Sequence, residues 1–147
     1  MSDQNPPVAF ENRCHDLYHA VILEHRMYPD RLLDHFQNPR NVGELPPPAV
    51  TVEVSNPACG DILRLSARFE NGCVTEARYK VRGCTASIAS GSALTEWLTG
   101  KSREELATFA PAVVDEAVGG LPAASKHAGV LCADAVKALL QRVRLNP

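Results

Sequence analysis

The chain has 147 residues, of which 45% are hydrophobic and 22% charged, and its formal net charge is −2. These values are typical of one soluble globular domain with a single core. Without a basic excess to hold a phosphate backbone, nucleic acid is not an expected partner. No apolar stretch approaches the roughly 20 residues that cross a bilayer, and residues 1–10 do not resemble a secretory signal, so we expect a cytoplasmic protein with no membrane partner.

The N-terminal part of the chain shows a helical pattern of apolar residues over residues 17–36. Pro29 interrupts this pattern, which predicts two helices or one broken helix. Residues 38–43 carry turn-forming side chains, and the prolines at 46–48 predict an extended segment before the next element.

The centre of the chain has the two-residue period of β-strands over residues 63–69 and 75–81. The intervening pair Asn71 and Gly72 predicts a tight type I′ hairpin, and residues 51–54 can supply a third strand. In the later strand Thr75, Ala77 and Tyr79 alternate with charged residues. This pattern predicts one wet face and one face covered by helices.

Three helices are expected after the strands. One covers residues 87–98 and ends at Gly100, a short one covers 101–109 and is broken by Pro111, and the longest covers 123–143. The order of helix, strands and helices predicts an α+β fold, a three-stranded antiparallel sheet with helices packed on one face.

Residues capable of metal or thiol chemistry occur at three separate places. Cys59 and Asp61 flank a glycine in the turn between two predicted strands, and Cys84 lies just before a predicted helix, where the unpaired amides favour a thiolate. His127 lies near the start of the last helix, with Cys132 five residues later. An imidazole is a donor that both zinc and iron accept.

Structural explanations remain open for each of these residues taken alone. The turn at Cys59 can be an ordinary one with a capping aspartate, and His127 can be a structural helix residue. Cys14 and Cys73 are expected to be small hydrophobic residues. Among the five cysteines no pair has the CxxC spacing of a zinc ribbon. The residues alone therefore indicate a metal or thiol site without identifying it.

At these residues the chain resembles the U-type iron–sulfur cluster scaffolds, the family of IscU, SufU and the N-terminal domain of NifU. The similarity extends over residues 28–140 and rests on four stretches at family spacing: DHFQNPRNVG at 34–43, NPACGD at 56–61, GCTASIAS at 83–90 and DAVKA at 134–138. Residues 28–147 are therefore expected to form the scaffold domain, and residues 1–27 an N-terminal extension that is partly flexible or helical.

The resemblance implies a scaffold and carrier protein rather than an enzyme. Family members accept sulfur as persulfide from a cysteine desulfurase, gather iron, hold a labile 2Fe–2S cluster, or zinc in its absence, and pass the cluster to recipient apo-proteins. The resemblance also implies the ligands: the family's first cysteine and its aspartate match Cys59 and Asp61, its second cysteine matches Cys84, and its histidine matches His127.

One family ligand is missing from this chain. The third cysteine of the family, which follows the histidine and also accepts sulfur, is replaced by Ala128. Cys132 lies about one helical turn after Ala128 on nearly the same helix face, so we hypothesise that Cys132 supplies the missing ligand. If Cys132 does not supply this ligand, the site consists of Cys59, Asp61, Cys84 and His127. The candidate persulfide acceptors are Cys84, Cys59 and Cys132.

Two further features place the chain within the family. The 43 positions from Cys84 to His127 are close to the IscU spacing and lack the insertion that SufU-like proteins carry there. Residues 121–125, Leu-Pro-Ala-Ala-Ser, keep only the first two residues of the motif by which IscU proteins bind a dedicated Hsp70-type chaperone, so that chaperone is not an expected partner. A homodimer is compatible with the resemblance.

Two other functions compete with the scaffold. The first is a zinc-binding sulfur acceptor, a SufU-like sulfurtransferase role in which a tetrahedral site masks and then releases a thiolate. The second is a structural zinc domain that unfolds when its metal is removed. The sequence contains no nucleophile elbow or triad signature that would indicate a hydrolase.

Overall fold

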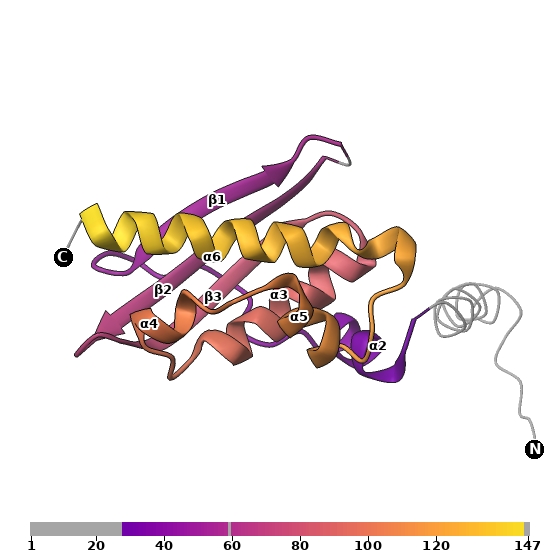
Figure 1. The fold of residues 1–147 in the computed structure, drawn as a ribbon, viewed down its shortest axis with the longest axis horizontal. Helices are drawn as coiled ribbons and strands as arrows, with labels where there is room; N and C mark the ends of the chain where they lie inside the picture. The colour runs from indigo at the N-terminus through magenta and orange to yellow at the C-terminus, as the bar shows by residue number, and fades with distance from the viewer. Residues whose placement is uncertain (1–27, 59, 146–147) are drawn as a thin grey trace, which may run out of the picture.

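The computed structural model describes residues 28–58 and 60–145. The strands form one antiparallel sheet in the order β1-β2-β3, with Val52 opposite Leu65 and Leu65 opposite Tyr79, which confirms the predicted α+β fold. The elements are helix α2 (Asp30–Gln37), strands β1 (Val50–Asn56), β2 (Asp61–Glu70) and β3 (Cys73–Arg82), helices α3 (Thr85–Leu98), α4 (Arg103–Leu106) and α5 (Pro111–Ala117), the 3₁₀ turn η1 (Ala123–Ser125) and helix α6 (His127–Leu145) (Figure 1).

The hairpin between β2 and β3 forms where the sequence predicts it. Asn71 and Gly72 have φ angles of 55° and 79°, the positive pair that a type I′ turn requires. The predicted alternation fails at Thr75, which is exposed, while its neighbour Val74 is buried. The register shifts beside Arg68, where the Thr75 hydroxyl donates to the Arg68 carbonyl, so a β-bulge inverts the pattern at this end of the strand.

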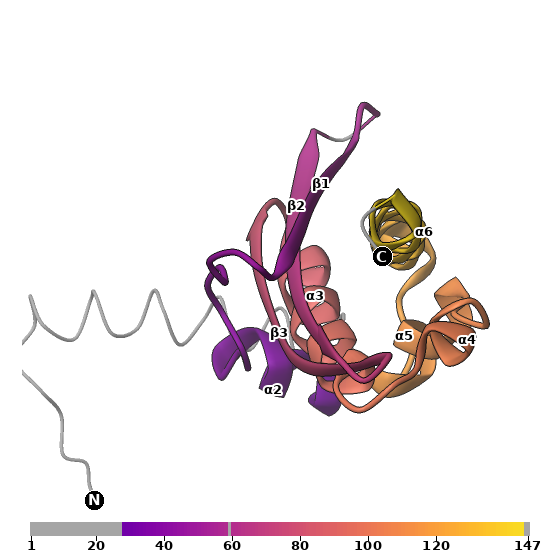
Figure 2. The same cartoon turned by 90° about the vertical axis from the view of Figure 1, so that its left-hand side faces the viewer.

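The long helices cover one face of the sheet, as predicted. Figure 2 shows α3 and α6 on the same side, with α6 packed against β1 and β2 and α3 packed against β3. Helix α2 packs against α3, where His35 Nδ1 lies 2.8 Å from Ser92 Oγ. The core between these layers includes side chains from strands and helices alike, among them Leu63, Leu65, Ala67, Tyr79, Leu94, Leu98, Leu131, Ala135 and Leu139.

The boundaries of the helices after the sheet differ from the predicted ones, and α3 already begins at Thr85 rather than at residue 87. Helix α4 covers only Arg103–Leu106 rather than the predicted residues 101–109, and it ends before Pro111 is reached. Pro111 is instead the first residue of α5, a helix that was not predicted, because proline suits the first turn of a helix as well as a break. The last helix begins at His127 rather than at residue 123, since a separate 3₁₀ turn precedes it. Gly100 follows α3 with φ of 91°, as expected for a helix stop.

The predicted helix over residues 17–36 is described only in part. Helix α2 begins directly after Pro29, in agreement with a break at that proline, and residues 17–27 lie outside the described residues. None of the helices in the described ranges is long and apolar enough to cross a membrane.

Candidate metal centre

Three of the predicted site residues, Asp61, Cys84 and His127, meet at the end of the sheet where β2 begins and β3 ends. Cys84 Sγ lies 3.5 Å from Asp61 Oδ2 and 3.6 Å from His127 Nε2, and His127 Nε2 lies 3.6 Å from Asp61 Oδ2. The potential ligand atoms of the three residues all lie within 4.8 Å of one another. Segments distant in the sequence thus bring a thiol, a carboxylate and an imidazole together.

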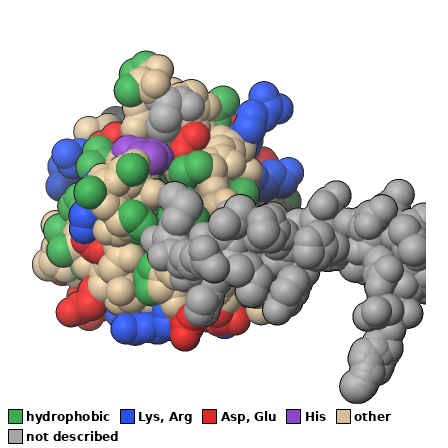
Figure 3. All heavy atoms as spheres, turned by 90° about the vertical axis from the view of Figure 1, so that its right-hand side faces the viewer, with side chains coloured by type: hydrophobic (Ala, Val, Ile, Leu, Met, Phe, Trp, Pro, Cys, Tyr) green, Lys and Arg blue, Asp and Glu red, His purple; other side chains and the backbone are tan. Residues whose placement is uncertain are grey.

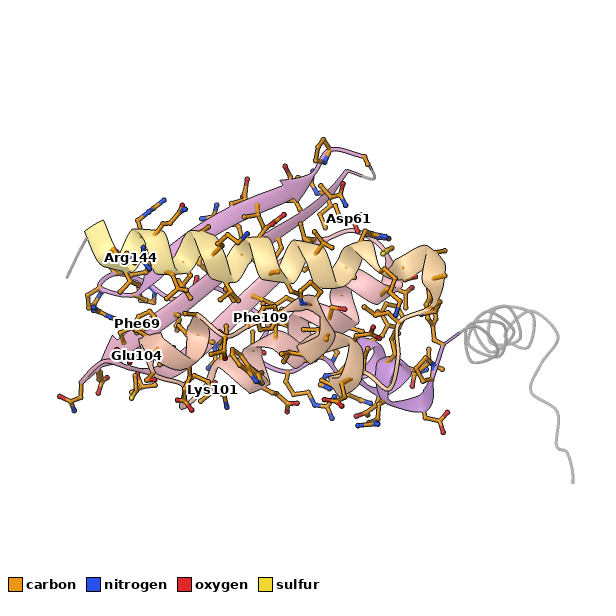
Figure 4. The ribbon with its side chains drawn as sticks, in the orientation of Figure 1. Asp61, Phe69, Lys101, Glu104, Phe109 and Arg144 are labelled. Atoms are coloured by element: carbon orange, nitrogen blue, oxygen red, sulfur yellow. The ribbon has the colours of Figure 1, made fainter. Side chains whose placement is uncertain are left out.

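The turn between β1 and β2 positions Asp61. Asn56 pairs with Asp61 across the turn, its backbone carbonyl accepts from Gly60 N at 2.7 Å, and its side-chain oxygen accepts from Ala58 N at 3.0 Å. Gly60 has φ of 75°, which favours glycine. Asp61 is only 5% exposed, and Figure 4 shows it at the end of the sheet that lies beside the first half of α6.

The other two residues, Cys84 and His127, are positioned by the starts of α3 and α6. Cys84 is the N-cap of α3, and its carbonyl accepts the first helical hydrogen bond from Ile88 N at 3.0 Å. His127 is the first residue of α6, with 28% of its side chain exposed. Figure 3 shows that on this side of the molecule a histidine side chain reaches the surface among hydrophobic and acidic side chains. The centre is therefore partly open to solvent.

Ser87 belongs to the site although the sequence analysis did not select it. Its hydroxyl donates to Asp61 Oδ2 at 2.5 Å and lies 3.3 Å from Cys84 Sγ, and the residue is buried. Ser87 follows Cys84 by three positions, so the first helical turn places the two side chains on the same face. This three-residue spacing could have identified Ser87 from the sequence, but only with a predicted helix that begins at Thr85 rather than at residue 87.

The surroundings favour the ionised form of Asp61. Burial alone would raise the pKa of this carboxyl group, but hydrogen bonds from Ser87 and Cys84 and the nearby His127 outweigh burial and hold the pKa below its ordinary value. Asp61 can therefore offer a carboxylate to a metal ion at neutral pH.

The structure does not bring Cys132 to these three donors. Within the described residues, the group whose ligand atoms lie within 4.8 Å contains Asp61, Cys84 and His127 only. Cys132 is 1% exposed in the hydrophobic core, and burial raises the pKa of its thiol to about 12. Ala128 is likewise buried, so the two do share a helix face, and that face is turned into the core.

The remaining cysteines either lie apart from this group or fall outside the residues that the structure describes. Cys73 is half-buried at the start of β3, at the opposite end of that strand from the site. Cys59 and Cys14 lie outside the described residues. Cys59 is two positions before Asp61 in the chain.

The donors present suit a metal ion. Thiolate, carboxylate and imidazole are the ligands that zinc takes in four-coordinate sites, and iron accepts the same set. The three side chains converge from a strand and two helix starts, so packed elements rather than one loop determine their spacing. Fold and donors together define a class: a small α+β domain with a mixed sulfur, oxygen and nitrogen donor set at one end of its sheet.

Comparison with known proteins assigns the family. The NifU-like N-terminal domain family matches residues 27–144. The chain therefore belongs to this family, which confirms the resemblance to U-type scaffolds. The crystal structure of an N-terminal NifU-like protein from Brucella abortus has the same fold, with a TM-score of 0.67 at 21% sequence identity over 84% of this chain and 98% of that one.

Relatives in sequence carry consistent names. The "Iron-sulfur cluster assembly scaffold protein IscU" of Azotobacter vinelandii is 41% identical over 118 residues, which cover 78% of this chain and 91% of that protein. The "Iron-sulfur cluster assembly enzyme IscU" of Drosophila melanogaster is 39% identical over 118 residues, covering 78% of this chain and 76% of that protein.

Proposed function

We propose that this chain is a scaffold on which a labile 2Fe–2S cluster is assembled for transfer to recipient apo-proteins. The observation that carries the proposal is the meeting of the Asp61, Cys84 and His127 donor atoms within 4.8 Å in a member of the NifU-like family. The names of its relatives as assembly scaffold proteins support the same function. The cluster is cargo in this scheme, since iron and sulfide arrive, are held and leave.

The proposed ligands are Cys59, Asp61, Cys84 and His127. Two thiolates, one carboxylate and one imidazole hold iron less firmly than the four thiolates of stable clusters, which suits a cluster that must be released. We leave Cys132 out of this set, because its buried thiol, with a pKa of about 12, is chemically a small apolar group.

Sulfur would enter on Cys84 or Cys59. The cysteine thiolate attacks the terminal sulfur of the desulfurase persulfide, a new S–S bond forms on this chain, and the old S–S bond breaks to release the desulfurase thiolate. The exchange has no net oxidation or reduction. The partial exposure of Cys84 supports this role, whereas a thiol as buried as that of Cys132 is out of reach of a partner.

Persulfide mapping tests the sulfur acceptor. The chain is incubated with cysteine and a cysteine desulfurase, and each cysteine is then alkylated and weighed by mass spectrometry. We expect the added sulfur on Cys84 or Cys59 and none on Cys132. Sulfur on Cys132 would restore that residue to the site.

A zinc-binding sulfur acceptor is the second candidate function. The three clustered donors together with Cys59 would make the four ligands of a tetrahedral zinc site, and this count favours the alternative. In that role zinc would mask a thiolate until the desulfurase delivers sulfur, and no cluster would form.

Anaerobic cluster assembly separates the two functions. The full chain is supplied with cysteine, a cysteine desulfurase, ferrous iron and a thiol reductant, and an apo-ferredoxin is added afterwards. The scaffold should gain visible absorption with equal amounts of iron and acid-labile sulfide and then lose them to the ferredoxin. Retained zinc, faster desulfurase turnover and no visible absorption would favour the zinc-binding acceptor.

The proposed partners are a cysteine desulfurase, recipient apo-proteins and a second copy of the chain in a homodimer. A dedicated Hsp70-type chaperone is not among them, since Leu121 of the shortened motif is buried and its amide is hydrogen-bonded to Asp115. In this proposal residues 28–147 form the scaffold domain and residues 1–27 an extension.

A further inference from the structure

One carboxylate fixes both ends of the segment that leads into the metal centre. Asp115, on α5, accepts a hydrogen bond from Leu121 N at 2.6 Å through Oδ1. Its Oδ2 accepts from Lys126 Nζ, also at 2.6 Å. Leu121 opens the segment before η1, and Lys126 directly precedes His127, so Asp115 acts as a clasp across residues 121–126.

This segment contains little regular secondary structure of its own. Gly119 and Gly120 precede it with φ angles of 85° and 112°, and glycine restrains the backbone less than any other residue. Within the segment, η1 is a single 3₁₀ turn closed by the bond from Ser125 N to the Pro122 carbonyl. The two hydrogen bonds to Asp115 therefore connect residues 121–126, whose backbone is weakly restrained by the preceding glycines, to the packed helix α5.

The clasp is charged at neutral pH. The hydrogen bond from Lys126 and that from the Leu121 amide outweigh burial and lower the pKa of Asp115 below its ordinary value. The Lys126 side chain is 56% exposed and that of Asp115 is 29% exposed. An ion pair as exposed as this one adds little to global stability, so a purely structural role predicts a small effect of its loss.

We propose that Asp115 is a positioning residue of the metal centre, which fixes the start of α6 and thereby places His127 Nε2 beside Cys84 and Asp61. The expected effect of Asp115 on metal binding rests on the proposed function, whereas its effect on the position of the α6 start does not. His127 is the first residue of α6, so a shift of that helix start moves the imidazole directly. Displacements of about 1 Å matter at such a site, because ligand atoms must stay within a narrow range of the productive geometry.

Zinc affinity measured in a double-mutant cycle tests this role. Asp115→Asn keeps the shape of the side chain but removes the charge, and we expect about a tenfold loss of zinc affinity in competition with a chromophoric chelator. In the His127→Ala background the same substitution should change zinc affinity less than twofold. An equal loss in both backgrounds, or no loss in either, would overturn the proposal.

Neighbouring residues offer matched controls. Glu116→Gln removes a carboxylate from the next position of α5, where the side chain is exposed, and should leave zinc affinity within twofold of the parent. Lys126→Met opens one side of the clasp and should weaken zinc binding, whereas Lys126→Arg keeps the ion pair and should restore it. Equal behaviour of the Met and Arg variants would contradict the proposed contact.

Hydrogen exchange of the metal-free chain tests the clasp without any metal. Asp115→Asn should speed amide exchange in the peptide that covers residues 126–132, and Glu116→Gln should not. Unchanged exchange in the Asp115→Asn variant would overturn the proposal even if zinc affinity fell. A parent chain that binds neither zinc nor a reconstituted cluster would instead reject the proposed function, while the exchange result would still decide whether Asp115 holds the start of α6.

Discussion

Gly83 leaves open the space that the Asp61 carboxylate occupies. A Cβ atom built on Gly83 would lie 2.6 Å from Asp61 Cγ, 2.8 Å from Oδ1 and 3.0 Å from Oδ2. Gly83 is also the residue between β3 and Cys84, so any shift of its backbone moves the thiol. A single position thus controls the packing of two of the three clustered donors.

Gly83→Ala should therefore damage both the fold and the site. We expect a loss of about 1–3 kcal/mol in the free energy of unfolding, the usual cost of forcing an extra methyl group into a packed site. Denaturant unfolding of the metal-free chain measures this loss. As a control, the same substitution added to Asp61→Ala should cost close to nothing, because the carboxylate is gone. Equal costs in the two backgrounds would contradict the steric explanation.

Ser87→Ala should weaken zinc binding about tenfold, since groups that orient a metal ligand typically contribute a factor of 10–100 in affinity. Ser87 donates to Asp61 Oδ2 and so holds the carboxylate in place. Ser90→Ala is the matched control: this serine lies on the same helix, is fully buried, and its hydroxyl has no hydrogen-bond partner among the described residues. If Ser90→Ala weakened zinc binding as much as Ser87→Ala, the role of Ser87 would be refuted.

Asp61→Ala should prolong the life of a bound cluster. The carboxylate oxygen is a weak donor to iron in a cluster, and it provides the position at which a recipient can begin ligand exchange. The decay of visible absorption after anaerobic reconstitution, with and without an apo-ferredoxin, measures cluster lifetime. Faster decay in the variant than in the parent would show that Asp61 retains the cluster rather than releasing it.

Cys132 should make the fold sensitive to alkaline pH. Burial raises the pKa of its thiol to about 12 in the folded chain, from an ordinary value of about 9. The unfolded thiol ionises first, so the stability due to the protonated thiol is complete below pH 9 and is lost as pH rises towards 12, by up to about 1.4 kcal/mol per unit.

The change in the free energy of unfolding per pH unit isolates the contribution of the Cys132 thiol. Unfolding of the metal-free chain between pH 8 and pH 10 should show a shallower decline for Cys132→Ala than for the parent. A parent slope unchanged by Cys132→Ala would mean that this thiol ionises normally and is accessible.

The sequence predicts those parts of the fold that depend on local patterns. The Asn71 and Gly72 turn, the three strands and the stop at Gly100 all follow from short-range propensities, and the structure confirms them. The bulge at Thr75 and the start of α5 at Pro111 escaped prediction, because each depends on how neighbouring elements pair or continue.

For the site, the sequence indicated which residues carry suitable chemistry but not how they are supported. Cys84 and His127 stand out as donor residues, whereas Ser87 and Asp115 look like ordinary polar residues until the helices are in place. The proposal for Cys132 took the correct helix face, but the sequence does not reveal that this face is turned into the core.

X-ray absorption at the zinc edge, on the zinc-loaded chain, tests the ligand set most directly. We predict two sulfur ligands at about 2.3 Å and two nitrogen or oxygen ligands at about 2.0–2.2 Å. One sulfur should be lost in Cys84→Ala and none in Cys132→Ala. A shell that is unchanged in Cys84→Ala, or that loses sulfur in Cys132→Ala, would contradict the proposed centre.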